Sequence, residues 1–433
     1  MEIGLVVTLV FVLLFALLFL GTHLGLAMSG VAILGTSLII GYDSALYLAG
    51  LSIFEAAQSF DLSVIPLFVL MGCLASRSGI SSDLFAAFHS WLGRFHGGLA
   101  HASIAACAAF GAVCGSSLAT AATMGQIALP EMKRFGYSDR LATGAIAAGG
   151  TIGILIPPSV IMLIYGILTE TSIGDLFIAG IVPGILLTLL FMATVVIIVK
   201  ADKSIVPEGS VAAPALSRST FAGVWATLAL FALVIGGIYG GFFTPTEAAG
   251  FGAAGAVVIG LVMKRLNLEL ILDSLMDTVQ TTAMIFLILI GAILFSGFLS
   301  LSGTPGMLGD WVVGLQLSPL MTIIVIVFIY ILLGAFLDTM AMIILSIPIF
   351  FPIVSNLGFD PIWFGVLVVV VVELALITPP MGINVFVIKG LAKDTPLSEI
   401  FLGVWPFCVA LVLLIVLIIA FPSIVTFLPE LAR

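Results

Sequence analysis

Two pairs of adjacent prolines interrupt long apolar segments of this chain. Pro157-Pro158 lies within the segment 141–168, and Pro379-Pro380 lies within the segment 361–388. Proline has no N–H and its ring clashes with the preceding turn, so an α-helix cannot continue through either pair. In a bilayer, such a break persists only where protein or a water-filled cavity surrounds the freed carbonyl groups. The sequence therefore predicts two broken helices whose unwound carbonyls suit a cation.

Small polar residues gather in the middle of two further segments. Gly115-Ser116-Ser117 divides the segment 97–135, and Gly334–Thr339 divides the segment 318–357. Each arm of the first segment has about 15–18 residues, or roughly 22–27 Å of helix. That length falls short of the hydrocarbon core, which is about 30 Å thick. We therefore predict two re-entrant helical hairpins; the alternative is one long spanning helix with a packing face of small residues.

The hairpin turns and the helix breaks together supply the candidate site. Half-helix N-termini attract anions, whereas hydroxyls, unwound carbonyls and half-helix C-termini suit Na⁺. A bound substrate is expected to contact Ser117, Thr120, Asp338, Thr339 and Asn384. One sodium site is expected at Ser116, Ser117, Gly153, Ile156 and Pro158, and a second at Gly334, Thr378, Met381 and Gly382.

Each of these polar side chains also has a structural alternative. Ser and Thr hydroxyls can satisfy nearby backbone groups, and Asp338 can cap the helix that follows it. Glu373 is a second intramembrane acid, which either pairs with a hydroxyl or backbone group or takes part in coupling. No Lys or Arg is expected in the interior. An anion would therefore be held by hydroxyls, N–H groups, helix dipoles and bound cations.

Composition places the whole chain in a membrane. Of its 433 residues, 62% are hydrophobic and 8% are charged, whereas soluble proteins carry about 25% charged residues. We expect a single integral membrane domain over 1–433, an all-α multi-pass protein in contact with the lipid bilayer. No basic run supports nucleic-acid binding. The sequence contains no HExxH or P-loop motif and no recognisable catalytic triad, so we expect no enzyme activity and no ATP hydrolysis.

An internal repeat relates the two halves of the chain. Pro157-Pro158 recurs 222 residues later, and Gly111 and Pro183 recur 223 residues later as Gly334 and Pro406. The repeat predicts a first half at 1–199 and a second half at 220–433, joined by a polar loop at 200–219.

The distribution of basic residues predicts how the two halves are oriented. Following the expected spans places every Lys and Arg except Arg433 on one side, which is expected to be cytoplasmic. The loop 200–219 then lies in the cytoplasm, and the two hairpins enter the membrane from opposite sides. Inverted repeats with broken helices are typical of secondary transporters that bind substrate near the membrane midplane.

Several motifs resemble those of one transporter family. They are Gly-Ser-Ser-x-Ala-Thr at 115–120, Leu-Pro-Glu-Met at 129–132, Gly-x-x-Ile-Pro-Pro-Ser at 153–159 and Gly-x-x-x-Asp at 334–338. This set resembles the large membrane subunit, of the DctM/SiaM type, of tripartite ATP-independent periplasmic (TRAP) transporters, and the likeness covers nearly the whole chain.

The resemblance implies a specific function and specific partners. It implies an elevator-type importer of organic acids in the bacterial inner membrane, driven by two or more Na⁺ ions. The expected partners are a small four-helix membrane subunit and a soluble periplasmic substrate-binding protein. Two alternatives remain: a carboxylate or ion transporter or antiporter that works alone, and an assembly subunit with no transport path of its own.

Overall fold

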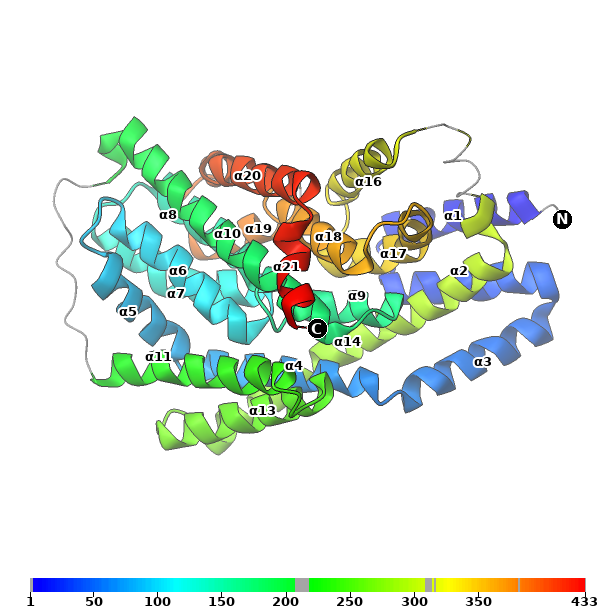
Figure 1. Cartoon of the computed structure of the whole chain (residues 1–433), viewed down its shortest axis with the longest axis horizontal. Coiled ribbons are helices and arrows are strands. Elements are labelled where there is room, and N and C mark those ends of the chain that lie inside the picture. The colour runs from blue at the N-terminus through cyan, green and yellow to red at the C-terminus, as the bar shows by residue number, and fades with distance from the viewer. Residues whose placement is uncertain (1–2, 207–217, 308–313, 315–316, 381, 433) are drawn as a thin grey trace.

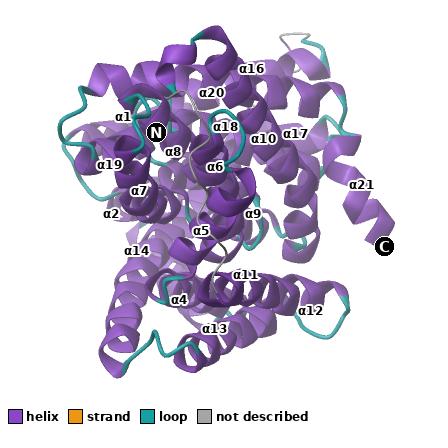
Figure 2. Cartoon of the chain, turned by 90° about the vertical axis from the view of Figure 1, so that its left-hand side faces the viewer, coloured by secondary structure: helices purple, strands orange, loops and turns teal. Residues whose placement is uncertain are grey.

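The computed structural model describes residues 3–206, 218–307, 314, 317–380 and 382–432. Within these ranges the chain is helical and contains no β-strand (Figures 1 and 2). The first half contains α1 (Ile3–Phe19), α2 (Leu24–Ile40), α3 (Tyr42–Gln58), η1 (Asp61–Ser63), α4 (Val64–Arg77), α5 (Ile80–Leu92), α6 (Gly98–Cys114), α7 (Ser117–Arg134), α8 (Asp139–Leu155), α9 (Val160–Thr169), α10 (Ile173–Ala201) and η2 (Lys203–Ile205). The second half contains α11 (Arg218–Phe231), η3 (Ala232–Gly236), α12 (Gly237–Tyr239), α13 (Pro245–Val262), α14 (Leu268–Leu301), α16 (Pro319–Leu333), α17 (Thr339–Asn356), α18 (Pro361–Ala375), α19 (Ile383–Leu391), α20 (Leu397–Ala420) and α21 (Ser423–Ala432).

Helices α1–α4 and α11–α14 form an outer layer whose apolar side chains are widely exposed. On α1, Leu5 and Val12 are exposed, and on α13 Val258 and Val262 are exposed. In both views α4, α11 and α13 lie together along one edge of the molecule (Figures 1 and 2). Exposed apolar side chains on so many helices are suited to contact with lipid or another membrane subunit.

Helices α6–α10 and α16–α20 form an inner bundle. Of these, α6, α8 and α18 are buried along almost their whole length. A helix that is apolar on all sides is either covered by neighbouring helices or exposed to lipid, and α18, with its run of valines, is covered by its neighbours. The inner bundle is therefore the core of the protein.

The structure confirms the two helical hairpins. In the first, α6 and α7 are joined at Gly115, which adopts φ +64° and so favours glycine. In the second, α16 and α17 are joined at 334–338. The first hairpin lies to the left and the second to the right of centre in Figure 1, with α9 and α18 between them.

Both predicted broken helices are also present. Helix α8 ends at Leu155 and α9 begins at Val160, so the first break spans the prolines at 157–158. Helix α18 ends at Ala375 and α19 begins at Ile383, so the second break spans the prolines at 379–380. Both Pro-Pro peptide bonds are cis.

Repeat-related positions hold each hairpin against a broken helix. A Cβ at Gly111 would overlap the Cα of Gly153, and a Cβ at Gly334 would overlap the Cβ of Ala375. Gly111 and Gly334 are the repeat-related glycines of the two hairpins, and Gly153 and Ala375 lie 222 residues apart on α8 and α18. The same small-residue contact therefore occurs twice.

Length and composition identify six described helices that could cross a membrane. They are Asp139–Thr169, Ile173–Ala201, Pro245–Val262, Leu268–Leu301, Thr339–Asn356 and Leu397–Ala420. The pair formed by α3 and the segment Asp61–Arg77, which is bent by 59°, would be a seventh. Most of the predicted loop 200–219 lies outside the described residues, so its position stays a prediction.

Replacing Gly111 with Ala tests the contact between the first hairpin and α8. Overpacking of a tight contact costs about 1–3 kcal/mol, so G111A should lower the midpoint of thermal unfolding in detergent. At Gly297 of α14 a Cβ would meet nothing within 4 Å. There, G297A should be neutral or stabilising by about 0.5–1 kcal/mol. Equal shifts in the two variants would show that the close approach at Gly111 is not a constraint.

Candidate functional site

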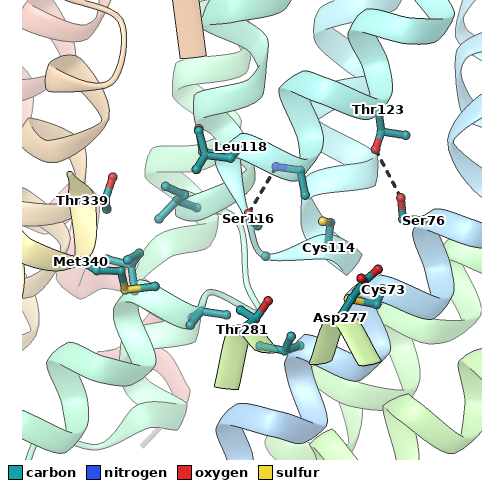
Figure 3. A pocket seen from close by; sticks show the side chains of 18 of the residues that line it. Cys73, Ser76, Cys114, Ser116, Leu118, Thr123, Asp277, Thr281, Thr339 and Met340 are labelled. Atoms are coloured by element: carbon teal, nitrogen blue, oxygen red, sulfur yellow. Dashed lines mark hydrogen bonds between the residues drawn. The ribbon is translucent and has the colours of Figure 1, made fainter. Parts of the chain in front are cut away.

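A cavity of about 700 Å³ lies where the two hairpin turns meet the two helix breaks. Its inner wall comes from 114–119 and 338–340 of the hairpins and from Ile154, Val160, Leu376 and Ile383 beside the breaks. Its outer wall comes from α4 and α14. Figure 3 shows Thr339 and Met340 on one side, Ser76 and Asp277 on the other, and Ser116 between them. Elements from both repeats and both layers therefore surround one space.

The turn of the first hairpin packs directly on the first break. A Cβ at Gly115 would lie 2.5 Å from the carbonyl oxygen of Pro158. The side chain of Ser116 caps α7 by accepting the N–H of Ala119 at 3.4 Å. The N-terminus of α7 thus opens at the cavity, beside the unwound backbone of the break.

The first break leaves carbonyl oxygens without their usual helical partners. Because Pro157 and Pro158 have no N–H, the carbonyls of Gly153 and Ile154 cannot accept the usual i+4 hydrogen bond. Within the described ranges no other group donates to them. A Cβ at Gly153 would lie 2.8 Å from Oγ1 of Thr120 and 3.4 Å from the carbonyl of Ser116. Gly153 of the expected first sodium site therefore has a group of two oxygen atoms beside it, one from Ser116 and one from Thr120, which was expected to contact the substrate.

Thr120 is part of this group and is fully buried. Its Oγ1 has no hydrogen-bonding oxygen or nitrogen partner in the described part of the chain, and the thiol of Cys114 lies beside it. A buried hydroxyl without a partner carries an energetic cost. A bound cation or water at this position would remove that cost.

The second break satisfies its carbonyls within the protein. The freed carbonyl of Ala375 accepts the hydroxyl of Thr378 at 3.5 Å, and that of Leu376 accepts the backbone N–H of Asn384 at 3.1 Å. Gly382 adopts φ +46°, and a Cβ there would lie 3.3 Å from the carbonyl oxygen of Thr378. Met381 lies outside the described residues. The two breaks thus share a cis Pro-Pro bond and differ in polar bonding.

Asn384 joins the second break to the first hairpin. Its amide nitrogen donates to Oγ of Ser117 at 2.7 Å and to the carbonyl of Ala147 on α8 at 3.2 Å. The side chain is completely buried, and its oxygen has no partner among the described residues. Sequence reasoning placed Asn384 in the site, but only the fold shows that it crosses between repeats.

Asp338 caps α17 and faces the cavity at the same time. Its Oδ1 accepts the N–H of Ala341 at 2.8 Å, and its side chain lines the cavity together with that of Thr339. The capping alternative is therefore present in the structure, but it uses only one carboxylate oxygen. The other oxygen remains available to the cavity.

Several predicted residues do not line this cavity. The residues that do not contribute to its wall are Asn384, Thr120, Gly153, Ile156, Pro158, Gly334, Thr378 and Gly382. Ile156 directs its side chain against Gly184 of α10, and Gly334 packs on α18. These residues form the layer that supports the two turns and the two breaks.

A basic side chain, that of Arg77, adds to the wall of the cavity from a partly exposed helix end. Arg77, at the end of α4, lines the cavity together with Asp277 and Thr281 of α14. Arg77 forms ion pairs with Asp273 and Asp277, about 200 positions away in sequence. Periodicity assigns Arg77 to a helix end, and nothing local in the sequence indicates this distant pairing.

Glu373 is a buried acid beside the second break. Its side chain is fully inaccessible, and neither carboxylate oxygen has a hydrogen-bond partner in the part of the chain that the structure describes. The structure thus does not show the hydroxyl or backbone pairing that was the simple alternative for this residue.

A double-mutant cycle tests the bond between Asn384 and Ser117. N384A and S117A should each destabilise the chain, and their effects should not add, because each removes one partner of the same bond. We expect a coupling free energy of about 0.5–2 kcal/mol from thermal unfolding in detergent. S103A provides a control, because Ser103 bonds to the backbone of its own helix. Additive effects for Asn384 and Ser117 would contradict the bond.

Solved structures and known sequences give an independent comparison. The structure of the YdaH transporter of Alcanivorax borkumensis matches with a TM-score of 0.63 at 19% identity, covering 88% of this chain and 90% of that chain. This likeness shows that the two proteins share a fold.

Two curated relatives match along almost their whole length. The chain is 36% identical to the C4-dicarboxylate TRAP transporter large permease protein DctM of Pseudomonas aeruginosa, covering 91% of this chain and 92% of that protein. It is 33% identical to the sialic acid TRAP transporter large permease protein SiaM of Vibrio cholerae, covering 95% of each. The family model described as tripartite ATP-independent periplasmic transporter, DctM component, matches residues 11–424. The chain therefore belongs to the DctM family, the large permease component of TRAP transporters.

Proposed function

We propose that this chain is the transport subunit of a sodium-driven importer of organic acids in the bacterial inner membrane. The observation that carries the proposal is the cavity between the two hairpin turns and the two helix breaks. In the proposed assembly, a periplasmic binding protein delivers the substrate and a small membrane subunit packs against the outer layer.

The cavity has groups suited to an organic anion. Helices α7 and α17 both begin at its wall, at Ser117 and Thr339, and helix N-termini favour negative charge. Hydroxyl groups of Ser116, Ser117 and Thr339 supply further donors. In the proposed binding mode, a substrate carboxylate lies between the two turns.

The charges of the cavity favour entry of an anion together with cations. The charged lining residues are Arg77, Asp277 and Asp338, which gives a formal charge of −1. An anion entering this space alone would meet a net repulsion, and low-dielectric surroundings strengthen such terms. Na⁺ ions held by the oxygens of the two breaks would offset it, which supports coupling to sodium.

The two layers suggest how transport proceeds. A Cβ at Gly72 of α4 would lie 2.7 Å from the carbonyl oxygen of Cys114 at the first hairpin turn, and Ser76 of α4 bonds to Thr123 of α7 at 3.3 Å. These contacts join the outer layer to the inner bundle without an ion pair. In the proposed elevator mechanism, the inner bundle slides along this interface with its substrate and sodium ions.

The names of relatives support the substrate class. They are named as TRAP transporter proteins for C4-dicarboxylates, sialic acid, isethionate and ectoine or 5-hydroxyectoine. These compounds carry at least one anionic acid group and differ greatly elsewhere. We infer that this permease recognises the acid group, and that the binding protein selects the rest.

Reconstitution into proteoliposomes tests the proposed function. The chain, its small subunit and the binding protein should together take up radiolabelled organic acid only when an inward Na⁺ gradient is present. Omitting either partner should abolish uptake. Uptake by the isolated chain would indicate a transporter that works alone. Uptake and Na⁺ dependence that stay unchanged both in S117A and in D338N would indicate an assembly subunit.

Replacing Asp338 with Asn separates capping from a role in the site. Asn caps helices about as well as Asp, so D338N should leave the unfolding temperature unchanged. Loss of the carboxylate from the cavity should lower the initial uptake rate about tenfold or more, an effect of about 1.4 kcal/mol or more. Asp360 is the matched control, since it caps α18 without lining the cavity. If D360N and D338N had equal uptake, the site role of Asp338 would be refuted.

A further inference from the structure

We propose that Arg77 binds the acid group of the substrate on the outer wall of the cavity, at the side from which substrate is released. The inference rests on the proposed function, because it assumes an organic anion in this cavity. It adds a cationic contact from the outer layer to a site otherwise built from the inner bundle.

Arg77 is the one basic residue among the described residues that line the cavity. Its side chain is 30% exposed, although it lies at the end of a packed helix. Its Nη1 donates to Oδ2 of Asp273 at 3.3 Å, and its Nη2 donates to Oδ2 of Asp277. Both acids lie on α14, four residues apart, so they hold the guanidinium against one side of the cavity.

The guanidinium has donors left after these bonds. Arginine carries five N–H donors in a planar fork, and the two acids use two of them. The remaining donors and the exposed part of the group are suited to a carboxylate or sulfonate, which arginine binds through paired hydrogen bonds. The acids orient the group, and they also weaken its hold on an anion, so release remains possible.

A second arginine of the same region shows what a purely structural pair looks like. Arg265 makes two bonds to Asp83, at 2.5 and 3.2 Å, and contacts the carbonyls of Ser78 and Gly79. Asp83 is 8% exposed, and neither residue lines the cavity. The two arginine side chains are similarly exposed, at 27% for Arg265 and 30% for Arg77. Arg265 has backbone and carboxylate partners on its fork, whereas Arg77 has two carboxylate partners and lines the cavity.

The position of Arg77 assigns it to one stage of transport. It belongs to α4 of the outer layer, and the charge pattern of the sequence places this helix end on the cytoplasmic side. If the inner bundle moves as proposed, its own residues travel with the substrate and Arg77 does not. Arg77 would therefore contact the acid group only in the conformation open to the cytoplasm.

Two variants with opposite expectations test the inference. In proteoliposomes containing the full chain and both partners, uptake of radiolabelled succinate, and then of sialic acid, is measured under a Na⁺ gradient. R77Q should lower the initial rate about tenfold or more. The variant D273N should keep the rate within about threefold, because Asp273 does not line the cavity, the guanidinium stays paired with Asp277 and an amide oxygen still accepts its bond. Exposed Arg134 pairs with Glu131, lies over the ring of Phe135 and does not line the cavity, so R134Q should match wild type.

Three outcomes would overturn the inference. One is wild-type uptake by R77Q, and another is an equal loss in R77Q and D273N, which would make Arg77 a tie between α4 and α14. If R77Q does not fold, R77K decides: Lys keeps the ion pair but not the fork, so the KM should rise severalfold at an unchanged unfolding temperature. A normal KM in R77K is the third. Absence of Na⁺-dependent uptake by wild type of any organic acid that its binding protein binds would instead refute the proposed function, and the inference with it.

Discussion

The structure depends on one constraint, which is that backbone groups freed within an apolar interior need partners. Each proline pair removes two helical hydrogen bonds at the centre of the inner bundle. At the second break, Thr378 and the N–H of Asn384 take over the freed carbonyls. At the first break, the carbonyls of Gly153 and Ile154 have no donor among the described residues. A bound cation can complete such a site, so one constraint accounts for the close packing around the breaks and for their chemistry.

Close packing of small residues brings the parts together. Each hairpin contacts a broken helix directly, because Gly111 packs on Gly153 and Gly334 packs on Ala375. Asn384 then joins the second repeat to Ser117 of the first. The outcome is a cavity whose walls come from segments far apart in the chain. Its hydroxyl groups and helix N-termini, together with a net negative lining, suit an anion that enters with cations.

The inner bundle and the outer layer have different parts in the proposed transport mechanism. The inner bundle carries the turns and the breaks, while the outer layer carries the ion pairs of Arg77 with Asp273 and Asp277. Exposed apolar side chains occur on both, for example Val12 of α1 and Trp405 of α20. The layers meet through the close approach of Gly72 to the carbonyl of Cys114 and through the hydrogen bonds from Ser76 to Thr123 and from Tyr239 to the carbonyl of Gly174. In the proposed mechanism, the inner bundle slides past the outer layer by breaking only a few such polar contacts.

The helices, the hairpins and the breaks could be predicted from the sequence, because proline pairs, glycine turns and apolar runs act through local backbone geometry. The repeat could also be predicted, since the two proline pairs and the pair Gly111 and Gly334 are separated by nearly the same number of residues. The contact of Asn384 with Ser117 and the pairing of Arg77 with Asp277 beside the cavity could not be predicted. Each joins positions 200 or more residues apart, so each depends on the tertiary structure. A local sequence pattern does not show which distant side chains meet. That depends on how the whole inner bundle packs.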